Sequence, residues 1–327
     1  MSSPLVYIIV LNWNGHEDTI RCVESLNKLD YPNFHIVVVD NGSSDDSVRI
    51  LSQIDGITLI RNSKNLGFSG GNNVAVRFAM DGGADYVWLV NSDATAASDS
   101  LSRLVAATEA DPRAGLASSV IYYAEERTRP QFCGSELNDQ IYEVTQLSLP
   151  VSQRLQADHP ERMVLWGTAL LVRRAVIEQI GLLNEGLFAY YEDTDYSIRS
   201  INAGFLNIMV YDSSVWHDSP IESGLRKPHY YYYMYRNDIL IRRNHIKSLV
   251  LLLKVLLWNF LRIRRSILQF KAAPQLAEAC LAGLWDGWLG VTGVYRPGRR
   301  MPAVVRRFVL AFGPNSSLQR TDNGLCR

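Results

Sequence analysis

The sequence predicts an α/β protein with a mostly parallel sheet that helices cover on both faces. Over the first hundred residues, short continuous apolar runs alternate with stretches that have helical periodicity or helix-capping residues. Continuous apolar strands are typical of parallel sheets, because both faces of such a sheet are buried. A chain of 327 residues with 47% hydrophobic content is long enough for one large domain and an appendage.

The expected elements follow in a regular order. The first strand covers residues 5–11 and stops at Asn12-Trp13-Asn14-Gly15, and a helix over 16–29 carries Ile20, Val23 and Leu26 on one face. The next elements are a strand at 34–39, a helix to residue 51 capped by Ser43 or Ser44, a strand at 57–60, a helix at 69–80, a strand at 86–90, and a helix to residue 110 capped by Ser98 or Asp99.

The pattern changes after about residue 116. Short β-like pieces are expected at 116–123, 141–149 and 164–172, around a polar stretch without an assignment. A helix at 192–203 and strands at 205–211 and 215–217 follow. Beyond Pro228 the chain is helical, basic and apolar together, so we expect a catalytic domain over 1–228 and a helical C-terminal region over 229–327.

The formal net charge of zero hides an uneven distribution. Residues 1–220 contain 15 Lys and Arg against 28 Asp and Glu, whereas residues 221–327 contain 18 against 5. A basic tail on an acidic body indicates an anionic partner, either membrane lipid or nucleic acid. A basic surface without a partner is equally compatible with this composition.

The cysteines and the N-terminus indicate a reducing compartment. Cys22, Cys133, Cys280 and Cys326 are scattered, without metal-ligand spacing or the pattern of a short secreted framework. The apolar run over residues 5–11 is too short for a signal segment and has no basic residues before it.

Polar residues follow the strands where ligands bind in parallel α/β sheets, at the carboxyl ends. Asn12, Asp40, Asn62 and Asp93 occupy such positions. Asp40 is suited to accept the imide N–H of a pyrimidine base, although a purely structural role as a cap is the more economical interpretation of its segment alone. Residues 65–73, Asn-Leu-Gly-Phe-Ser-Gly-Gly-Asn-Asn, are suited either to a sugar or phosphate or to a close-packed helix start.

Two acidic segments contain the candidate catalytic and metal-binding residues; we name Asn91-Ser92-Asp93 and Glu192-Asp193-Thr194-Asp195 the two acidic stations. Asp93, in Asn91-Ser92-Asp93, is a candidate ligand for Mg²⁺ or Mn²⁺ with a diphosphate, and His217 is a candidate second ligand. Asp193, beside Glu192 and Asp195, is the candidate general base, while an acidic first turn stabilised by the helix dipole is the alternative. Asp195 and Arg199 have the i,i+4 spacing of a helix pair, which leaves Asp193 as the better candidate.

Seven motifs in order resemble glycosyltransferase family 2. They are I-I-V-L-N-W-N-G from residue 8, V-V-V-D-N-G-S-S-D from 37, N-L-G-F-S-G-G-N-N from 65, N-S-D from 91, W-G-T-A-L-L-V-R-R from 166, Y-Y-E-D-T-D-Y-S-I-R from 190 and W-H-D-S from 216. The block from residue 65 and the later Tyr235-Arg236-Asn237 are most similar to rhamnosyltransferase-type members. The resemblance covers roughly residues 5–240 and implies a GT-A fold with inverting transfer from a nucleotide-diphosphate sugar.

The resemblance also implies roles for particular residues. The donor would contact Asn12, Asn14, Asp40, Asn41, Asn65, Gly67, Gly70, Asn72 and Asn91; the acceptor side would contain Trp166, Gly167, Thr168 and Glu192; Asp93 and His217 would bind the metal, and Asp193 would be the base. The family's usual metal motif is D-x-D, and here its first position is Asn91. A single carboxylate therefore remains, which increases the expected importance of His217.

The basic tail contains an apolar helix that is too short to span a bilayer. Residues 249–261 are apolar except for Lys254 and Asn259, and basic residues flank them. This pattern, with Trp258, favours an interfacial helix on an anionic membrane, and residues 281–291 with Trp285 and Trp288 are expected to add a second such surface. A helical cap on the catalytic domain or a homodimer interface is the alternative.

Together these observations predict a peripheral membrane enzyme on the cytoplasmic face. It would transfer a sugar, with rhamnose from dTDP-rhamnose as the best candidate, to a glycan or polyprenyl-diphosphate-linked acceptor in bacterial cell-surface polysaccharide synthesis. The alternatives are a sugar nucleotidyltransferase, for which a basic glycine-rich loop near the N-terminus is missing, and a non-catalytic membrane or nucleic-acid binder. The ordered motifs disfavour the second alternative, so nucleic acid is not expected as a partner.

Overall fold

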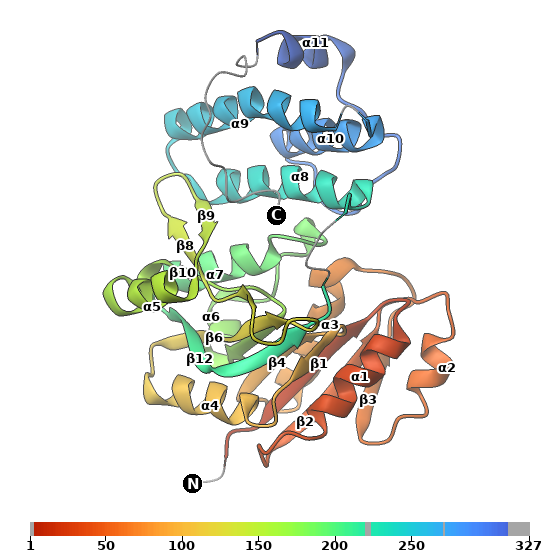
Figure 1. Cartoon of the computed structure of the whole chain (residues 1–327), viewed down its shortest axis with the longest axis vertical. Coiled ribbons are helices and arrows are strands. Elements are labelled where there is room, and N and C mark those ends of the chain that lie inside the picture. The colour runs from red at the N-terminus through yellow and green to blue at the C-terminus, as the bar shows by residue number, and fades with distance from the viewer. Residues whose placement is uncertain (1–2, 220–223, 271, 313–327) are drawn as a thin grey trace. The chain divides into compact units, whose positions relative to one another are not determined.

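The computed structural model describes residues 3–219, 224–270 and 272–312 (Figure 1). The chain forms two compact units. Unit 1 comprises residues 1–137, 144–185 and 192–221, and unit 2 comprises residues 138–143, 186–191 and 222–327. Two short segments from the N-terminal two thirds of the chain therefore belong to the unit that the C-terminal helices form.

A mixed nine-stranded sheet forms the centre of the described part of unit 1. Its strands, in spatial order, are β3 (Ile57–Arg61), β2 (Phe34–Asp40), β1 (Val6–Asn12), β4 (Tyr86–Asn91), β11 (Ala169–Arg173), β6 (Ala114–Tyr123), β12 (Leu206–His217) and β5 (Ala94–Ala96), with β7 (Pro130–Phe132) beside β6. The first four are parallel, β11 is antiparallel to both of its neighbours, and β12 is parallel to β6. A small second sheet has the order β10 (Met163–Val164), β8 (Ser135–Asn138) and β9 (Glu143–Gln146).

Helices cover both faces of the large sheet and create two separate cores. The helices α1 (His16–Leu26), α2 (Ser47–Leu51) and α4 (Ser100–Ala110) contribute to one core, and α3 (Gly67–Asp81), α5 (Leu149–Asp158), α6 (Arg174–Ile180) and α7 (Glu192–Asn202) to the other. Within β1, Ile8 and Val10 enter the first core and Tyr7 and Ile9 the second. This alternation explains why the strand reads as a continuous apolar run.

The order of strands and helices over the first ninety residues is as predicted, while the short strand β5 was not expected and the start of α2 differs. The helix that ends at Leu51 begins only at Ser47, after Asp46, so neither Ser43 nor Ser44 caps it. Instead, Ser43 Oγ accepts a hydrogen bond from the Asn14 N–H, and the Ser44 N–H donates to Asn14 Oδ1. These serines therefore join the loops after β1 and β2.

Further differences occur after residue 140, where the periodicity is weak. The polar stretch without an assignment contains helix α5 and a short 3₁₀ helix, η1 (Pro160–Arg162). The strand expected at 164–172 is interrupted, because β10 ends at Val164 and β11 begins at Ala169. The two strands expected around residue 210 form one strand, β12, with a register irregularity between Val210 and Ser214.

The C-terminal part of unit 2 is helical, as the sequence predicts. Its helices are α8 (Pro228–His245), α9 (Leu249–Gln269), α10 (Pro274–Leu289) and α11 (Ala303–Phe312) (Figure 1). Helix α10 packs closely on α8: a Cβ added at Gly283 would lie 2.3 Å from the Tyr232 carbonyl oxygen. A second 3₁₀ helix, η2 (Glu185–Leu187), crosses the boundary between the two units.

The close packing of α10 overturns one expectation. Most side chains of α10, including Leu281 and Leu284, are buried in the core of unit 2, and Trp285 and Trp288 pack against that core. The second lipid-facing surface expected over residues 281–291 is therefore wrong, because this helix supplies the unit's interior. Among the described helices, none combines the length and apolar character needed to cross a bilayer.

Candidate active site

The ends of β1 and β2 are joined by a buried polar network. Asn12 Nδ2 donates to Asp40 Oδ2 at 2.9 Å and to Ser43 Oγ at 3.2 Å. Asp40 Oδ1 accepts from the Ser43 N–H at 3.0 Å, and Asn12 Oδ1 accepts from Thr19 Oγ1 at 2.9 Å. A carboxylate has about four lone-pair positions, so Asp40 can accept a hydrogen bond from a further N–H or O–H group. The network fixes Asp40 at the strand end, and its role toward a base stays a prediction.

Asn41 anchors the glycine- and asparagine-rich segment. Its Oδ1 accepts from the Leu66 N–H at 3.1 Å, and its Nδ2 donates to the Gly67 carbonyl oxygen at 3.0 Å and to Asn65 Oδ1 at 3.2 Å. Gly67 has a φ of +76°, and a Cβ on Gly71 would lie 2.5 Å from Leu11 Cδ1. The segment therefore has a demonstrated packing role.

The other residues of this region that were predicted to bind the sugar donor also make contacts within the chain. Asn72 Nδ2 donates to the Phe68 carbonyl oxygen at 2.9 Å. Asn14, with a φ of 52°, accepts from the Ser44 N–H at 2.8 Å. A Cβ on Gly70 would lie 2.9 Å from Leu66 Cβ, so this glycine allows the first turn of α3 to form tightly. Contact of any of them with a donor sugar stays a prediction.

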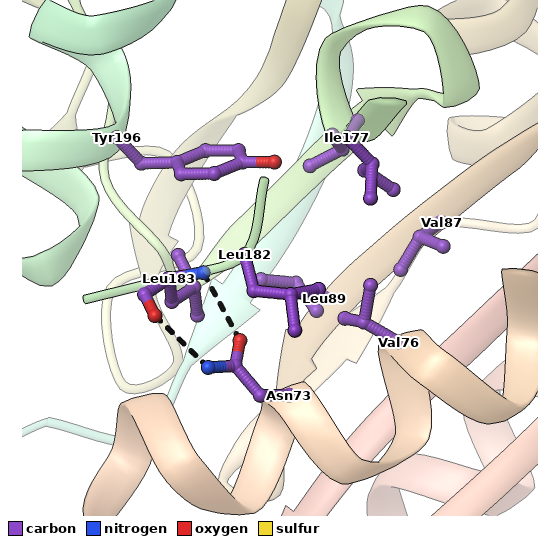
Figure 2. A pocket seen from close by; sticks show the side chains of 9 residues that line it. Asn73, Val76, Val87, Leu89, Ile177, Leu182, Leu183 and Tyr196 are labelled. Atoms are coloured by element: carbon purple, nitrogen blue, oxygen red, sulfur yellow. Dashed lines mark hydrogen bonds between the residues drawn. The ribbon is translucent and has the colours of Figure 1, made fainter. Parts of the chain in front are cut away.

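Asn73 connects α3 to the segment before η2. Its side chain exchanges two hydrogen bonds with the Leu183 backbone, at 2.9 and 3.0 Å, as Figure 2 shows, and also donates to Glu185 Oε1. Beside it lies a small cavity lined mostly by apolar side chains of α3, β4 and α6. The cavity is unsuited to a sugar, because Asn73 is already bonded and the Tyr196 hydroxyl donates to the Gly181 carbonyl oxygen.

Asp93 and His217 lie together because β5 pairs with the end of β12. His217 Nε2 is 3.1 Å from Asp93 Oδ1, while His217 Nδ1 is 2.8 Å from Gln131 Oε1. If Gln131 accepts the Nδ1 proton, Nε2 faces a carboxylate oxygen with a proton or a cation between them. No local pattern points to Gln131, because the pairing of β7 with β6 brings it to this histidine.

The second acidic station is tied to the same edge of the sheet. The Asn91 N–H donates to the Thr168 carbonyl oxygen at 2.9 Å, and Asp193 Oδ2 accepts from the Gly167 N–H at 2.9 Å. A Cβ on Gly167 would lie 3.4 Å from Asp193 Cβ and 3.5 Å from the Phe68 ring, so the glycine allows these elements to meet. Residues 166–168 thus connect the station around Asp93 with the station around Asp193.

Neighbouring side chains complete the environment of this link. Trp166 stacks on Phe132 with ring centroids 4.4 Å apart. Asn91 Oδ1 is buried and accepts no hydrogen bond from the described residues. Contact of Asn91 with the sugar donor stays a prediction.

Glu192 and Asp193 differ in the hydrogen-bond donors that reach their carboxyl groups. Glu192 is buried, and its Oε2 has no hydrogen-bond partner among the described residues. Burial, and next the charge of Asp193, raise the pKa of Glu192 well above its usual value. Burial also raises the pKa of Asp193, but N–H donors from Gly167 and Thr194 oppose that rise. Burial therefore raises the pKa of both carboxyl groups, and the N–H donors of Gly167 and Thr194 limit that rise at Asp193.

Asp195 has a structural role. Its Oδ2 accepts from Arg199 Nε at 2.7 Å, and the Arg199 guanidinium also donates to the carbonyl oxygens of Ile180 and Leu182. The helix pair expected from the i,i+4 spacing is confirmed. Asp193 is thus the acidic residue of this turn with both a raised pKa and backbone N–H donors.

The Tyr235-Arg236-Asn237 motif, for which the sequence predicted no role, contains two residues that clamp a loop within unit 2. Asn237 Nδ2 donates to the carbonyl oxygens of Leu187, Ala189 and Tyr190, at 3.0, 2.8 and 2.7 Å. The fully buried Arg236 donates to the Leu187 carbonyl oxygen at 2.6 Å. The loop that they hold contains three residues with positive φ, namely Phe188, Tyr190 and Tyr191. We name Arg236 and Asn237 the loop clamp; the loop ends one peptide bond before Glu192.

Comparisons with known proteins identify the family and the fold. The family model for glycosyl transferase family 2 matches residues 7–181, more than half of the chain. The dTDP-rhamnosyl transferase RfbF of Shigella flexneri is 22% identical over 88% of this chain and 97% of its own length. An N-acetylglucosaminyl-diphospho-decaprenol L-rhamnosyltransferase of Mycobacterium tuberculosis is 26% identical over 66% of this chain and 77% of its own length.

Solved structures support the same architecture. The mannosyltransferase PcManGT of Pyrobaculum calidifontis, in complex with GDP-Man and Mn²⁺, has a TM-score of 0.58 at 16% identity, over 89% of this chain and 88% of its own. S. aureus TarS residues 1–349 in complex with UDP has a TM-score of 0.56 at 18% identity, over 86% of this chain and 80% of its own. The GT-A fold is therefore confirmed, and the nucleotidyltransferase and non-catalytic alternatives are set aside: the chain is a glycosyltransferase and belongs to glycosyl transferase family 2.

Proposed function

We propose that this glycosyltransferase moves a rhamnosyl residue, with inversion, from dTDP-rhamnose to a hydroxyl of a glycan or polyprenyl-diphosphate-linked acceptor in cell-surface polysaccharide synthesis. The observation that carries the proposal is the link through residues 166–168, which ties the Asp93–His217 pair to Asp193 at one edge of the sheet. A glycosyltransferase needs one group that stabilises negative charge on the leaving diphosphate and another that accepts the proton of the acceptor hydroxyl.

Asp193 is the proposed base. Its carboxylate accepts the proton of the acceptor hydroxyl while that oxygen forms a bond to the anomeric carbon. On the opposite face the bond from that carbon to the diphosphate oxygen breaks, and the diphosphate leaves with the electron pair. General-base help of this kind contributes about 10²–10⁴-fold to a rate. The raised pKa of Asp193 makes it a better proton acceptor than an ordinary aspartate.

Asp93 and His217 are the proposed holders of Mg²⁺ or Mn²⁺. One carboxylate oxygen and one imidazole nitrogen 3.1 Å apart fit such an ion, and Gln131 orients the imidazole through its other nitrogen. No group of three or more His, Cys, Asp or Glu suited to a metal occurs among the described residues, so the donor's phosphates would complete the coordination. The ion, when bound, stabilises negative charge on the diphosphate.

The choice of donor and acceptor rests on relatives. RfbF carries dTDP-rhamnosyl transfer in its name and matches along 97% of its length, and the mycobacterial relative is named for a decaprenol-diphosphate acceptor. A polyprenyl-linked acceptor and the basic C-terminal region together favour a peripheral position on the cytoplasmic face of the membrane.

The test combines calorimetric titration with turnover. The protein is titrated with dTDP-rhamnose, UDP-N-acetylglucosamine and GDP-mannose, each with Mn²⁺, Mg²⁺ or EDTA. We expect metal-dependent binding of dTDP-rhamnose, and Asp193→Asn should bind it equally well but lose at least about 10²-fold in turnover. Turnover retained by Asp193→Asn would remove Asp193 as the base.

The metal site has its own control. Asp93→Ala should lose the difference in donor affinity between Mn²⁺ and EDTA, whereas Asp212→Ala, at an exposed position of β12, should keep it. If donor affinity is unaffected by EDTA in the unaltered protein, the proposed role of Asp93 and His217 is wrong. Strong binding of a different donor with no binding of dTDP-rhamnose would overturn the rhamnosyl assignment and leave the family membership intact.

A further inference from the structure

Helix α9 has two apolar faces, of which only one is covered by the described residues of unit 2. Val255, Leu256 and Ile263 are buried in the core of this unit. On the other face, at i,i+4 spacing, lie five apolar side chains that are each 51–66% exposed: Leu249, Val250, Leu253, Leu257 and Trp258. We name these five residues the α9 stripe. A contiguous exposed apolar surface of this kind is typical of an interaction site.

The charges around the α9 stripe are positive. Lys254 lies within the stripe and is exposed, and Lys247 is exposed just before the Ser248 cap of the helix. The sequence of α9 contains no Asp or Glu. The side chains of Arg262, Arg264 and Arg265, expected to flank the apolar run, lie outside the described set. The described part of the helix thus combines an apolar face with lysines and no opposing charge.

Helix α11 repeats the pattern on a smaller scale. It packs on α9, and it exposes Val304 and Phe308 one turn apart, with the exposed Arg307 between them; Arg306 is also exposed and forms an ion pair with Glu278 of α10. Alternation of apolar and basic side chains on an exposed helix is the composition of segments that lie in the membrane interface. Two helices of unit 2 therefore share this character, although they are separate in sequence.

We propose that the α9 stripe, with α11 beside it, inserts into the headgroup region of a membrane that contains anionic lipid. Trp258 suits the boundary between headgroups and acyl chains, and Lys254 and Lys247 suit lipid phosphates. A second copy of the chain fits less well, because an isologous contact through the stripe would bring the same lysines of both copies together. The proposal assigns a surface to the membrane location proposed above and does not depend on the identity of the sugar.

The test measures partition of the full-length protein into sucrose-loaded vesicles by sedimentation. Vesicles are made of phosphatidylcholine alone or of equal parts of phosphatidylcholine and phosphatidylglycerol. We expect binding to the anionic vesicles that weakens as salt is added. The double variant Leu253→Asp/Leu257→Asp should lose roughly tenfold or more, because two leucines no longer bury apolar surface in the interface.

Two further variants separate the apolar and the charged contributions. Lys254→Gln should lose about fivefold on anionic vesicles, which corresponds to the ~1 kcal/mol of one lysine near an anionic surface, and nothing on neutral ones. Val151→Asp, at an exposed apolar position of α5 in unit 1, is the matched control and should bind like the unaltered protein. Circular dichroism of each variant checks that the helices are retained.

Several outcomes would overturn the proposal. Equal binding of neutral and anionic vesicles would refute the role of the lysines. Undiminished binding of the double variant would move the lipid contact to another surface. If no vesicle binding occurs and light scattering shows a dimer that the double variant converts to a monomer, the occupant of the α9 stripe is a second copy.

Discussion

The loop clamp is predicted to keep a strained loop closed. Phe188, Tyr190 and Tyr191 have φ values of 65°, 66° and 70°, a region in which non-glycine residues each cost roughly 1 kcal/mol or more. Asn237 Nδ2 donates to three carbonyl oxygens of the loop, and Arg236 Nη2 donates to one of them, that of Leu187, as a fourth contact. At about 1 kcal/mol net each, these four bonds offset the roughly 3 kcal/mol of backbone strain.

Asn237→Asp should therefore release the loop. The aspartate has almost the same size, but acceptor oxygens replace the amide donors that face the three carbonyl oxygens. Loss of about 3 kcal/mol raises the equilibrium for local loop opening by roughly 100-fold. Chymotrypsin cleaves after Phe and Tyr, so nicking within residues 188–191 reports this opening when opening and closing are faster than cleavage.

A matched control distinguishes loop release from general destabilisation. Ile239 is buried on the same helix and makes no hydrogen bond to the loop in the described structure, and Ile239→Ala should cost about 2–5 kcal/mol. We expect Ile239→Ala to lower Tm without accelerating cleavage at residues 188–191. Equal nicking rates for Asn237→Asp and the unaltered protein, or equal acceleration by both variants, would refute the role of the clamp.

Three other predictions concern unit 1. Glu192→Gln should flatten the dependence of Tm on pH. In the unaltered protein, stability falls as pH rises above the unfolded pKa of ~4.3, because folded Glu192, whose pKa is raised, holds a proton that the unfolded residue releases. An unchanged slope of Tm against pH in the variant would contradict this. Gln131→Leu should raise the Mn²⁺ concentration for half-maximal donor binding by about 10-fold or more, and no change in a metal titration would show that Gln131 does not orient His217. Gly71→Ala should lower the free energy of unfolding by about 1–3 kcal/mol, since its Cβ would meet Leu11 Cδ1 at 2.5 Å; a neutral effect in urea unfolding would mean that β1 and α3 separate easily.

Local sequence patterns were reliable where the periodicity is strong. The strands β1, β2 and β4 are continuous apolar runs buried on both faces, and their alternation with α1 and α3 predicted the parallel part of the sheet. The pattern failed at α5, whose polar sequence has a weak apolar face. It also failed at α10, because apolar side chains around a helix do not say whether protein or lipid covers them.

The candidate site was predicted in part for the same reason. Asn12, Asp40 and Asp93 follow apolar strands, so their place near one sheet edge could be inferred from the sequence. Gln131 had no such signal, and Asn237 was noted only as part of the Tyr235-Arg236-Asn237 motif, because both act through contacts to residues distant in the chain. Pairing of distant segments is decided by tertiary packing, which a local pattern does not contain.

The sequence by itself determined the α/β class, the order of the first elements, the basic C-terminal helices and the two acidic stations, because periodicity, capping and charge are local properties. Only the tertiary structure decided that residues 166–168 link the two stations, through the Asn91–Thr168 and Gly167–Asp193 hydrogen bonds. It also decided that the pKa of Glu192 is raised well above its usual value, whereas N–H donors limit the rise at Asp193. That distinction depends on burial and on the N–H donors within reach, and both are set by the packing of α7 against the loop before β11.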